Sequence, residues 1–158
     1  MENRFRAIAG RTRATEPRRV TLADDSRLAR GATEQLFFMG MPRVNVLLAG
    51  KDEVIRLVLQ TLRAHVQQPV SSWSPSDPFT LPPRDRSGTL ILHEVGALAI
   101  REQIRLLEWS ARGMRGTQVI STTSEPLFPR VRAGAFIDTL YYRLNTVYID
   151  VTETDQAA

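Results

Sequence analysis

Short, nearly uninterrupted apolar runs that alternate with helical segments most limit what this chain can fold into. These runs lie at residues 45–49, 89–93, 117–121 and 146–150. A strand that is buried on both faces has this continuous apolar character, whereas a strand with one solvent-facing side alternates. Between the runs, apolar residues recur at helical spacing. The pattern predicts an α/β fold with a mostly parallel sheet flanked by helices.

Three helices are expected between these strands. The first begins after Gly50, where Asp52 and Glu53 favour a helix N-terminus. The second is predicted after residue 99 and has a suitable stop at Gly113. Its apolar residues recur on one helical face, namely Ile100, Ile104, Leu107 and Ala111. The third is indicated by the spacing of three apolar residues, namely Phe136, Leu140 and Leu144.

The stretch from Pro69 to Pro83 contains five prolines. Proline lacks a backbone donor and fixes φ, which excludes a helix or a central strand over most of this stretch. Residues 69–73 could form a short strand, and the remainder is expected to be a loop.

The first 35 residues differ from the rest of the chain. Residues 1–30 carry eight arginines and four acids, and apolar positions follow no regular period. We therefore expect a basic, flexible arm over 1–35, with a short helix near 24–35, a globular core over 36–152 and a short tail over 153–158. The arm could follow the phosphates of DNA or RNA, or it could simply be solvated, and the sequence leaves both open.

Composition excludes several classes of protein. The chain has no cysteine, so disulfides, thiolate zinc sites and thiol nucleophiles are excluded. No apolar run reaches the roughly 18–20 residues that cross a bilayer, and the N-terminus lacks the apolar core of a secretory signal. A cytoplasmic protein without membrane contact is expected. His65 and His93 lack further spaced ligands, so no metal site is predicted.

Four motifs lie in one order along residues 88–145. Residues 88–98 read Gly-Thr-Leu-Ile-Leu-His-Glu-Val-Gly-Ala-Leu, and residues 103–107 read Gln-Ile-Arg-Leu-Leu. Residues 119–127 begin in the third predicted strand and continue through Thr-Thr-Ser at 122–124, and residues 140–145 read Leu-Tyr-Tyr-Arg-Leu-Asn. This series resembles the Walker B strand, the following helix, the sensor strand and the arginine-finger segment of sigma-54-dependent activators, which are AAA+ ATPases. Residues 44–66 are a looser match to the first strand and helix of that family, and residues 1–35 show none.

The resemblance implies a P-loop NTPase-like core, and it also shows where this chain departs from the family. The family's phosphate loop has a glycine, four residues, and then Gly-Lys. Here Gly50 is followed at once by Lys51 and Asp52, so about five loop residues are missing. A turn of this length has too few backbone amides to surround a triphosphate. No cofactor is therefore expected, and ATP-Mg at Gly50 and Lys51 stays as the alternative.

Two strand ends have also changed. The resemblance assigns magnesium to an aspartate and activation of water to a glutamate, and this chain has His93 and Glu94 at these positions. Imidazole is a poor ligand for Mg²⁺, so only Glu94 is retained as a vestigial catalytic residue. At the sensor position Thr123 is kept, and Ser124 stands where the family has asparagine.

The arginine-finger segment is half retained. Ile137 occupies the first arginine position, and Arg143 keeps the second. Since arginine fingers stabilise the charge of the transferred phosphate, the loss of one arginine would reduce turnover most. Arg143 could instead pair with Asp138, which we expect to be its role here.

These departures predict a transcription-related regulatory or partner-binding module that does not hydrolyse ATP. Candidate partners are AAA+ activator subunits or a second copy, bound through the arginine-finger face. The candidate contact residues on that face are Phe136, Tyr141, Tyr142 and Arg143. Direct contact with sigma-54 is not expected, because the family's Gly-Ala-Phe-Thr-Gly-Ala loop has no counterpart.

Three alternatives remain. One is residual ATP binding completed by another subunit, the second is nucleic-acid binding through the arm, and the third is a remnant without activity. The short segment after the last strand predicts an α/β core without the helical lid that closes over nucleotide in the family.

Overall fold

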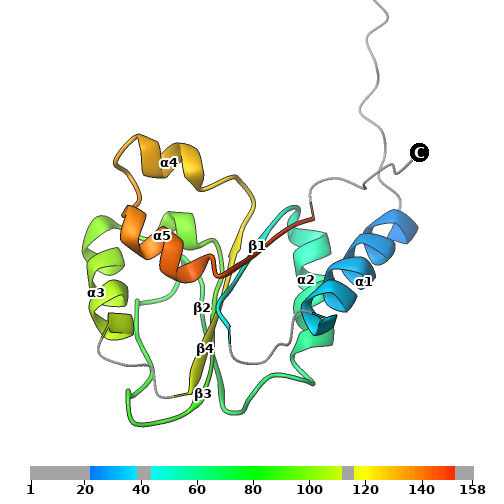
Figure 1. Cartoon of the computed structure of the whole chain (residues 1–158), viewed down its shortest axis with the longest axis horizontal. Helices are drawn as coiled ribbons and strands as arrows, with labels where there is room; N and C mark the ends of the chain where they lie inside the picture. Colours follow the sequence, from blue (N-terminus) through cyan, green and yellow to red (C-terminus); the bar gives the residue numbers. More distant parts are fainter. Residues whose placement is uncertain (1–21, 39–43, 112–115, 152–158) are drawn as a thin grey trace, which may run out of the picture.

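A computed structural model describes residues 22–38, 44–111 and 116–151 (Figure 1). The elements in chain order are α1 (Leu22–Phe38), β1 (Val46–Ala49), α2 (Asp52–Leu62), β2 (Val70–Trp73), β3 (Gly88–Leu92), the 3₁₀ turn η1 (Val95–Ala97), α3 (Ile100–Ala111), β4 (Thr117–Thr123), α4 (Phe128–Arg132), α5 (Asp138–Leu144) and β5 (Val147–Asp150). Most of the predicted arm, at 1–21, lies outside these ranges, as do the tail at 153–158 and the helix stop at Gly113.

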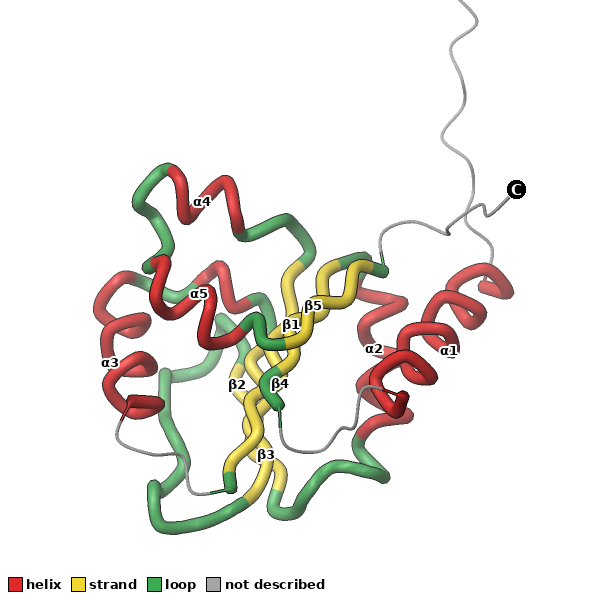
Figure 2. The backbone as a smooth tube through the Cα atoms, in the orientation of Figure 1, coloured by secondary structure: helices red, strands yellow, loops and turns green. Residues whose placement is uncertain are grey.

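The five strands form one sheet in the order β2-β3-β4-β1-β5, and every pair is parallel (Figure 2). All residues of β1, β3 and β4 are buried, as expected of central strands covered on both faces. The predicted α/β class, the four apolar strands and the short strand over 70–73 are confirmed.

The helices cover both faces of the sheet. Helices α1 and α2 lie on one side, and α3, α4 and α5 lie on the other (Figure 1). The side chains of β1 alternate between two apolar clusters: Val46 and Leu48 belong to the cluster under α1 and α2, and Leu47 belongs to the other. This alternation is the pleat of a strand whose successive side chains point to opposite faces.

Helix α1 corrects the predicted start of the globular part. Ala29, Ala32 and Leu36 are buried in the cluster that α2 and the sheet also form. The boundary expected at residue 35 therefore falls inside a packed helix. Its four buried positions are two alanines, Thr33 and Leu36, and alanine and threonine add little to an apolar period, so the sequence pattern understated this helix.

Helix α3 buries a different face from the one its apolar spacing suggests. Ile100 is 45% exposed and Ile104 is 44% exposed. The buried residues of this helix are Gln103, Leu106, Trp109 and Ser110. Gln103 and Ser110 are polar, so the spacing of the apolar residues alone indicated the exposed side of α3 as its buried side. Helix α4 was not predicted.

No helix in the described part of the chain is both long and apolar enough to cross a lipid bilayer.

Candidate functional site

The carboxyl ends of β1, β3 and β4 bring the predicted site residues to one edge of the sheet. The Gly50 N–H donates to the Thr123 carbonyl at 3.0 Å. The Glu94 N–H donates to the Thr122 hydroxyl at 3.2 Å, and the Ser124 hydroxyl donates to the Glu94 carboxylate at 3.2 Å. The strand-end residues that the sequence singled out are thus neighbours, as expected in an open parallel sheet.

The turn from β1 to α2 is closed by its neighbours. A Cβ atom on Gly50 would lie 2.4 Å from the Val151 Cγ2 atom and 3.1 Å from the Val151 carbonyl carbon, and φ at Gly50 is +157°. Glycine is required here because the chain after β5 packs directly against it. The amide of Gly50 is already used by the sheet, so this turn does not offer it to a ligand.

Acidic side chains occupy the start of α2. Lys51 is the N-cap residue and makes no capping bond through its side chain, and Asp52 and Glu53 lie in the first turn. All three side chains are exposed. The positive end of the helix dipole is thus already matched by two carboxylates, which repel an incoming polyphosphate. The groups at this turn do not fit ATP-Mg.

His93 lies half-buried directly after β3, and its backbone N–H donates to the Trp73 carbonyl at 2.9 Å. Burial lowers the pKa of its imidazole below the usual 6.5, and the nearby Arg63 lowers it further, while Asp52 and Glu94 oppose the shift. The ring is therefore neutral at neutral pH. A neutral imidazole does not replace the carboxylate that a hard Mg²⁺ ion prefers.

Glu94 is held in an uncommon backbone conformation, with φ 48° and ψ 57°. A residue other than glycine rarely adopts this left-handed region. The bonds to Thr122 and Ser124 described above and a bond from the Ala97 N–H to the Glu94 carbonyl, at 2.8 Å, fix it there. The Glu94 carboxylate thus accepts from the Ser124 hydroxyl, and no cationic side chain among the described residues forms an ion pair with it.

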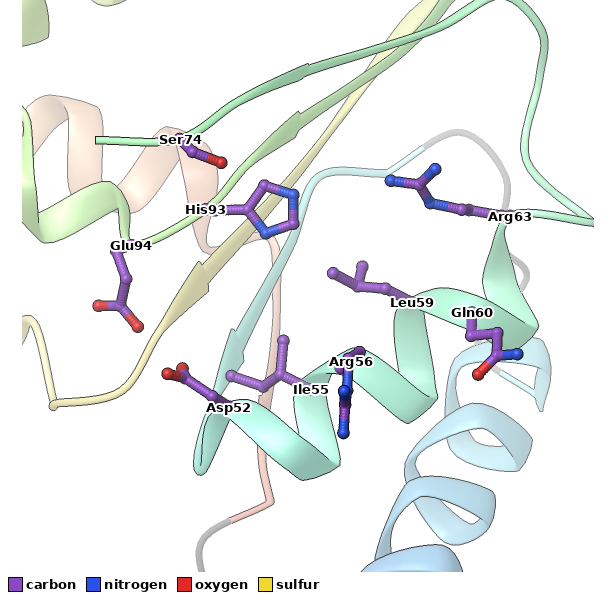
Figure 3. Close-up of a pocket in the computed structure, with 9 residues that line it drawn as sticks. All are labelled: Asp52, Ile55, Arg56, Leu59, Gln60, Arg63, Ser74, His93 and Glu94. Carbon is purple, nitrogen blue, oxygen red and sulfur yellow. The ribbon is translucent and has the colours of Figure 1, made fainter. Parts of the chain in front are cut away.

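A cavity of about 650 Å³ separates α2 from the ends of β2 and β3 (Figure 3). Its lining comprises Asp52, Ile55, Arg56, Leu59, Gln60, Arg63, Ser74, His93 and Glu94. Asp52 and Glu94 lie at one end, Arg63 lies at the other, and the His93 ring lies between them. Ile55 and Leu59 give the α2 side an apolar surface. Such a cavity suits a polar group of mixed charge better than a polyanion.

The sensor strand retains its threonine in a structural role. Thr123 is buried, and its hydroxyl donates to the Glu125 carbonyl, which stabilises the turn after β4. Ser124 is exposed, and its hydroxyl donates to the Glu94 carboxylate. Neither hydroxyl points to a separate binding site.

Arg143 on α5 corrects a second expectation. Its guanidinium donates to the Ser110 hydroxyl on α3 at 3.2 Å, whereas the Asp138 carboxylate accepts from the Thr139 N–H at 2.6 Å. The predicted Arg143–Asp138 ion pair is therefore wrong, because Asp138 is used at the start of its own helix. Only Arg30 and Glu34 form an ion pair within the described ranges.

The arginine-finger face is smaller than predicted. Phe136 is 1% exposed, so it belongs to the core and is not available to a partner. Tyr141 is half-buried and lies 5.3 Å from Tyr142 between ring centroids. Tyr142 is 64% exposed, so it is the most accessible of the aromatic residues that the sequence singled out on this face.

Gln103 has a role that the sequence did not reveal. Its side chain is fully buried and donates to the carbonyls of Leu98 and Ala135, at 2.9 and 3.1 Å. It also accepts from the Ile137 N–H at 2.9 Å. One amide thus ties α3 to the loops before it and before α5. The only signal was its place in the Gln-x-x-Leu-Leu motif.

Solved structures with a similar fold include three of NtrX from Brucella abortus. The complex with ATP is 18% identical with a TM-score of 0.60, over 84% of this chain and 36% of that one. The complex with ADP is 19% identical with a TM-score of 0.57, over 79% and 36%. A further NtrX structure is 16% identical with a TM-score of 0.61, over 82% and 39%. This chain thus spans less than half of the NtrX chains, and the likeness shows a P-loop NTPase-like fold.

No curated protein matches the chain in sequence. The family model for the sigma-54 interaction domain matches residues 49–154, from the end of β1 to beyond β5. This match covers the strand ends described above and most of the chain. The chain therefore belongs to the sigma-54 interaction domain family, of the AAA+ type.

Proposed function

We propose that this domain acts as a regulatory or partner-binding module related to transcription and that it does not hydrolyse ATP. The observation that carries the proposal is the closed β1–α2 turn. The Gly50 amide bonds to Thr123, its Cα lies against Val151, and α2 starts two residues later. Backbone amides that would surround a triphosphate in a phosphate loop have no counterpart in this turn.

The strand ends beside the turn support the same proposal. A neutral His93 stands where the family places its magnesium-associated aspartate, and Arg143 contacts Ser110 within its own chain. Glu94 alone would retain the capacity of a general base, and a base without a positioned metal and phosphate does not catalyse hydrolysis. What remains exposed on the arginine-finger face is an aromatic surface at Tyr142.

Nucleotide binding tests the first half of the proposal. We expect no rise in melting temperature of the isolated domain at millimolar ATP-Mg²⁺, and no heat of binding in calorimetry, because only ligands that bind the folded state stabilise it. NtrX, which crystallised with ATP, is the positive control. A saturable rise in melting temperature would contradict the proposal and favour the alternative of residual ATP binding.

Capture experiments test the second half. An immobilised copy of this domain should retain intact AAA+ members of the sigma-54 interaction family. Tyr142→Glu should weaken that retention, because the substitution introduces a charge into the exposed aromatic surface. Tyr148 on β5 is also exposed, at 41%, so Tyr148→Glu serves as the control that introduces the same charge elsewhere. Equal retention by both variants would contradict a role for the arginine-finger face.

A further inference from the structure

The outer side of α3 carries an apolar stripe that no described part of the chain covers. The four residues of this stripe are Ile100, Ile104, Leu107 and Ala111. On an α-helix they fall within about 60° of one another around the axis. Ile100 and Ile104 are 45% and 44% exposed, Ala111 is exposed and Leu107 is half-buried. Figure 1 shows α3 at the edge of the molecule, with its inner side against the sheet and α5.

Two opposite charges line one side of this stripe. Arg101 and Glu108 are exposed, and helical geometry places them about 20° apart around the axis and two turns apart along it. Neither forms an ion pair with any described residue. The other charged residues of α3 have contacts within the chain: Glu102 accepts from the Ala99 N–H, and Arg105 donates to the Phe79 carbonyl and lies over its ring.

We propose that this surface binds a second copy of the chain through antiparallel pairing of the two α3 helices. A two-fold axis perpendicular to both helices makes them antiparallel, so residues near the start of one α3 lie opposite residues near the end of the other. Ile104 then meets Leu107 of the second copy, and Ile100 meets Ala111. The same axis keeps the charged flanks on one side, so Arg101 of each copy faces Glu108 of the other. A surface that is complementary to itself in this way fits an isologous dimer.

The charge pattern distinguishes this pairing from other arrangements. In a parallel pair the two-fold axis runs along the helices, so each flank of the stripe faces the other flank of the second copy. Arg101 and Glu108 would then face the flank of Gln103 and Ser110, which are uncharged and buried against the domain. Only the antiparallel arrangement therefore brings Arg101 of one copy opposite Glu108 of the other.

The expected dimer is weak. A helix of 12 residues is about 18 Å long, which is short for the roughly 1,200 Å² that stable interfaces bury. We therefore expect dissociation constants in the micromolar range or above. This inference names a second copy of the chain as one partner for the binding role proposed above. It can be tested separately from that role, because self-association is measured without nucleotide and without another protein.

Sedimentation velocity of the full chain across the micromolar range tests the dimer. Wild-type protein should show a concentration-dependent rise in mass toward twice that of one chain. Ile104→Glu should abolish the rise, because it places a charge at the centre of the apolar contact. Tyr148→Thr, at similar exposure on β5, should leave it unchanged. Unchanged circular dichroism would show that all three proteins fold alike.

Charge reversal tests the antiparallel register. Arg101→Glu and Glu108→Arg should each weaken self-association by about tenfold, since each replaces two attractive pairs with two repulsive ones. A one-to-one mixture of these two variants should associate again, because every facing pair is then opposite in charge. The double variant Arg101→Glu/Glu108→Arg should also recover.

The outcomes separate this inference from the proposed function. A monomer at every concentration, or a dimer that Ile104→Glu leaves intact, would overturn α3 pairing. Association of the mixture no stronger than that of the single variants would overturn the antiparallel register. These results leave the capture of intact AAA+ proteins as a separate test. If a strictly monomeric domain still captured those proteins, the proposed binding role would stand and the α3 dimer would not. Loss of that capture with Ile104→Glu would instead assign the stripe to the other protein.

Discussion

The β1–α2 turn and the segment from β3 to α5 differ in what they have kept. The segment carries the motifs of the family, and most of their residues pack in the core: Leu140 and Leu144 are buried, and Gln103 bonds to three backbone groups. The turn crosses from β1 to α2 through Gly50 and Lys51 alone and is closed by Val151. The recognisable motifs therefore mark residues that hold the domain together.

This difference separates two kinds of change. The proposed loss of ATP hydrolysis would rest on side chains such as His93 at the end of β3. At the end of β1 it would rest on the backbone, because the turn is short and the Gly50 amide already donates to the Thr123 carbonyl. A point substitution can reverse the first kind of change but not the second, which requires additional residues.

Gly50→Ala should have the largest effect on stability. The new Cβ atom would overlap Val151, and φ of +157° is unfavourable for any side chain. We expect a loss of about 3 kcal/mol in the free energy of unfolding, measured by chemical denaturation.

Gly31→Ala is the matched control for that experiment. Gly31 lies inside α1, and a Cβ there would meet nothing within 4 Å. This substitution should stabilise the domain by about 0.5 to 1 kcal/mol, because alanine favours the helix. Equal and small effects of the two variants would show that the β1–α2 turn is not closed as described.

Gln103→Leu should have the next largest effect. Leucine has a similar volume but leaves the Ile137 N–H and the carbonyls of Leu98 and Ala135 without their partner. We expect a loss of about 2 kcal/mol in the free energy of unfolding. Gln60→Leu on α2, where the side chain is exposed, should stay within about 0.5 kcal/mol of wild type. A comparable loss in both would argue against the structural role of the motif glutamine.

Much of the fold followed from the sequence because buried parallel strands have a direct signature. The runs at 45–49, 89–93, 117–121 and 146–150 became β1, β3, β4 and β5 with small shifts at their ends. Helix faces were harder to predict. The core side of α3 contains Gln103 and Ser110, whose polar groups are satisfied by backbone and by Arg143, and hydropathy alone does not register such contacts.

The site was predicted as a set of neighbours, though not in its contacts. Topology alone brings Gly50, Glu94 and Thr123 together, since the carboxyl ends of parallel strands share an edge. The partner of Arg143 and the burial of Phe136 depend on how α5 sits against α3, which no local pattern encodes. The cavity beside α2 likewise depends on the spacing between a helix and two strand ends.

Acid should weaken the domain through His93, with a smaller effect than the two substitutions above. Its pKa is lowered mainly by burial, so as pH falls the unfolded chain takes up this proton first. The stabilising contribution is complete above the unfolded pKa of 6.5 and is lost as pH falls through the lower native value. The melting temperature of wild type should therefore fall more steeply than that of His93→Gln between about pH 7.5 and about pH 5. Parallel curves would mean that the half-buried ring does not couple to folding.

His93→Asp should have the smallest effect, and this result would test the contrast between the two strand ends most directly. The substitution restores the carboxylate that the family uses with magnesium, next to the retained Glu94. If the side chains at β3 limited nucleotide binding, the variant would gain a rise in melting temperature with ATP-Mg²⁺. We expect no such rise, because the Gly50 amide remains bonded to Thr123 and the carboxylates of Asp52 and Glu53 remain at the start of α2. An added carboxylate also increases the negative charge that a polyphosphate would meet. Calorimetry with ATP-Mg²⁺, with NtrX as the positive control, measures this outcome, and binding by the variant alone would place the decisive change at β3 and not at β1.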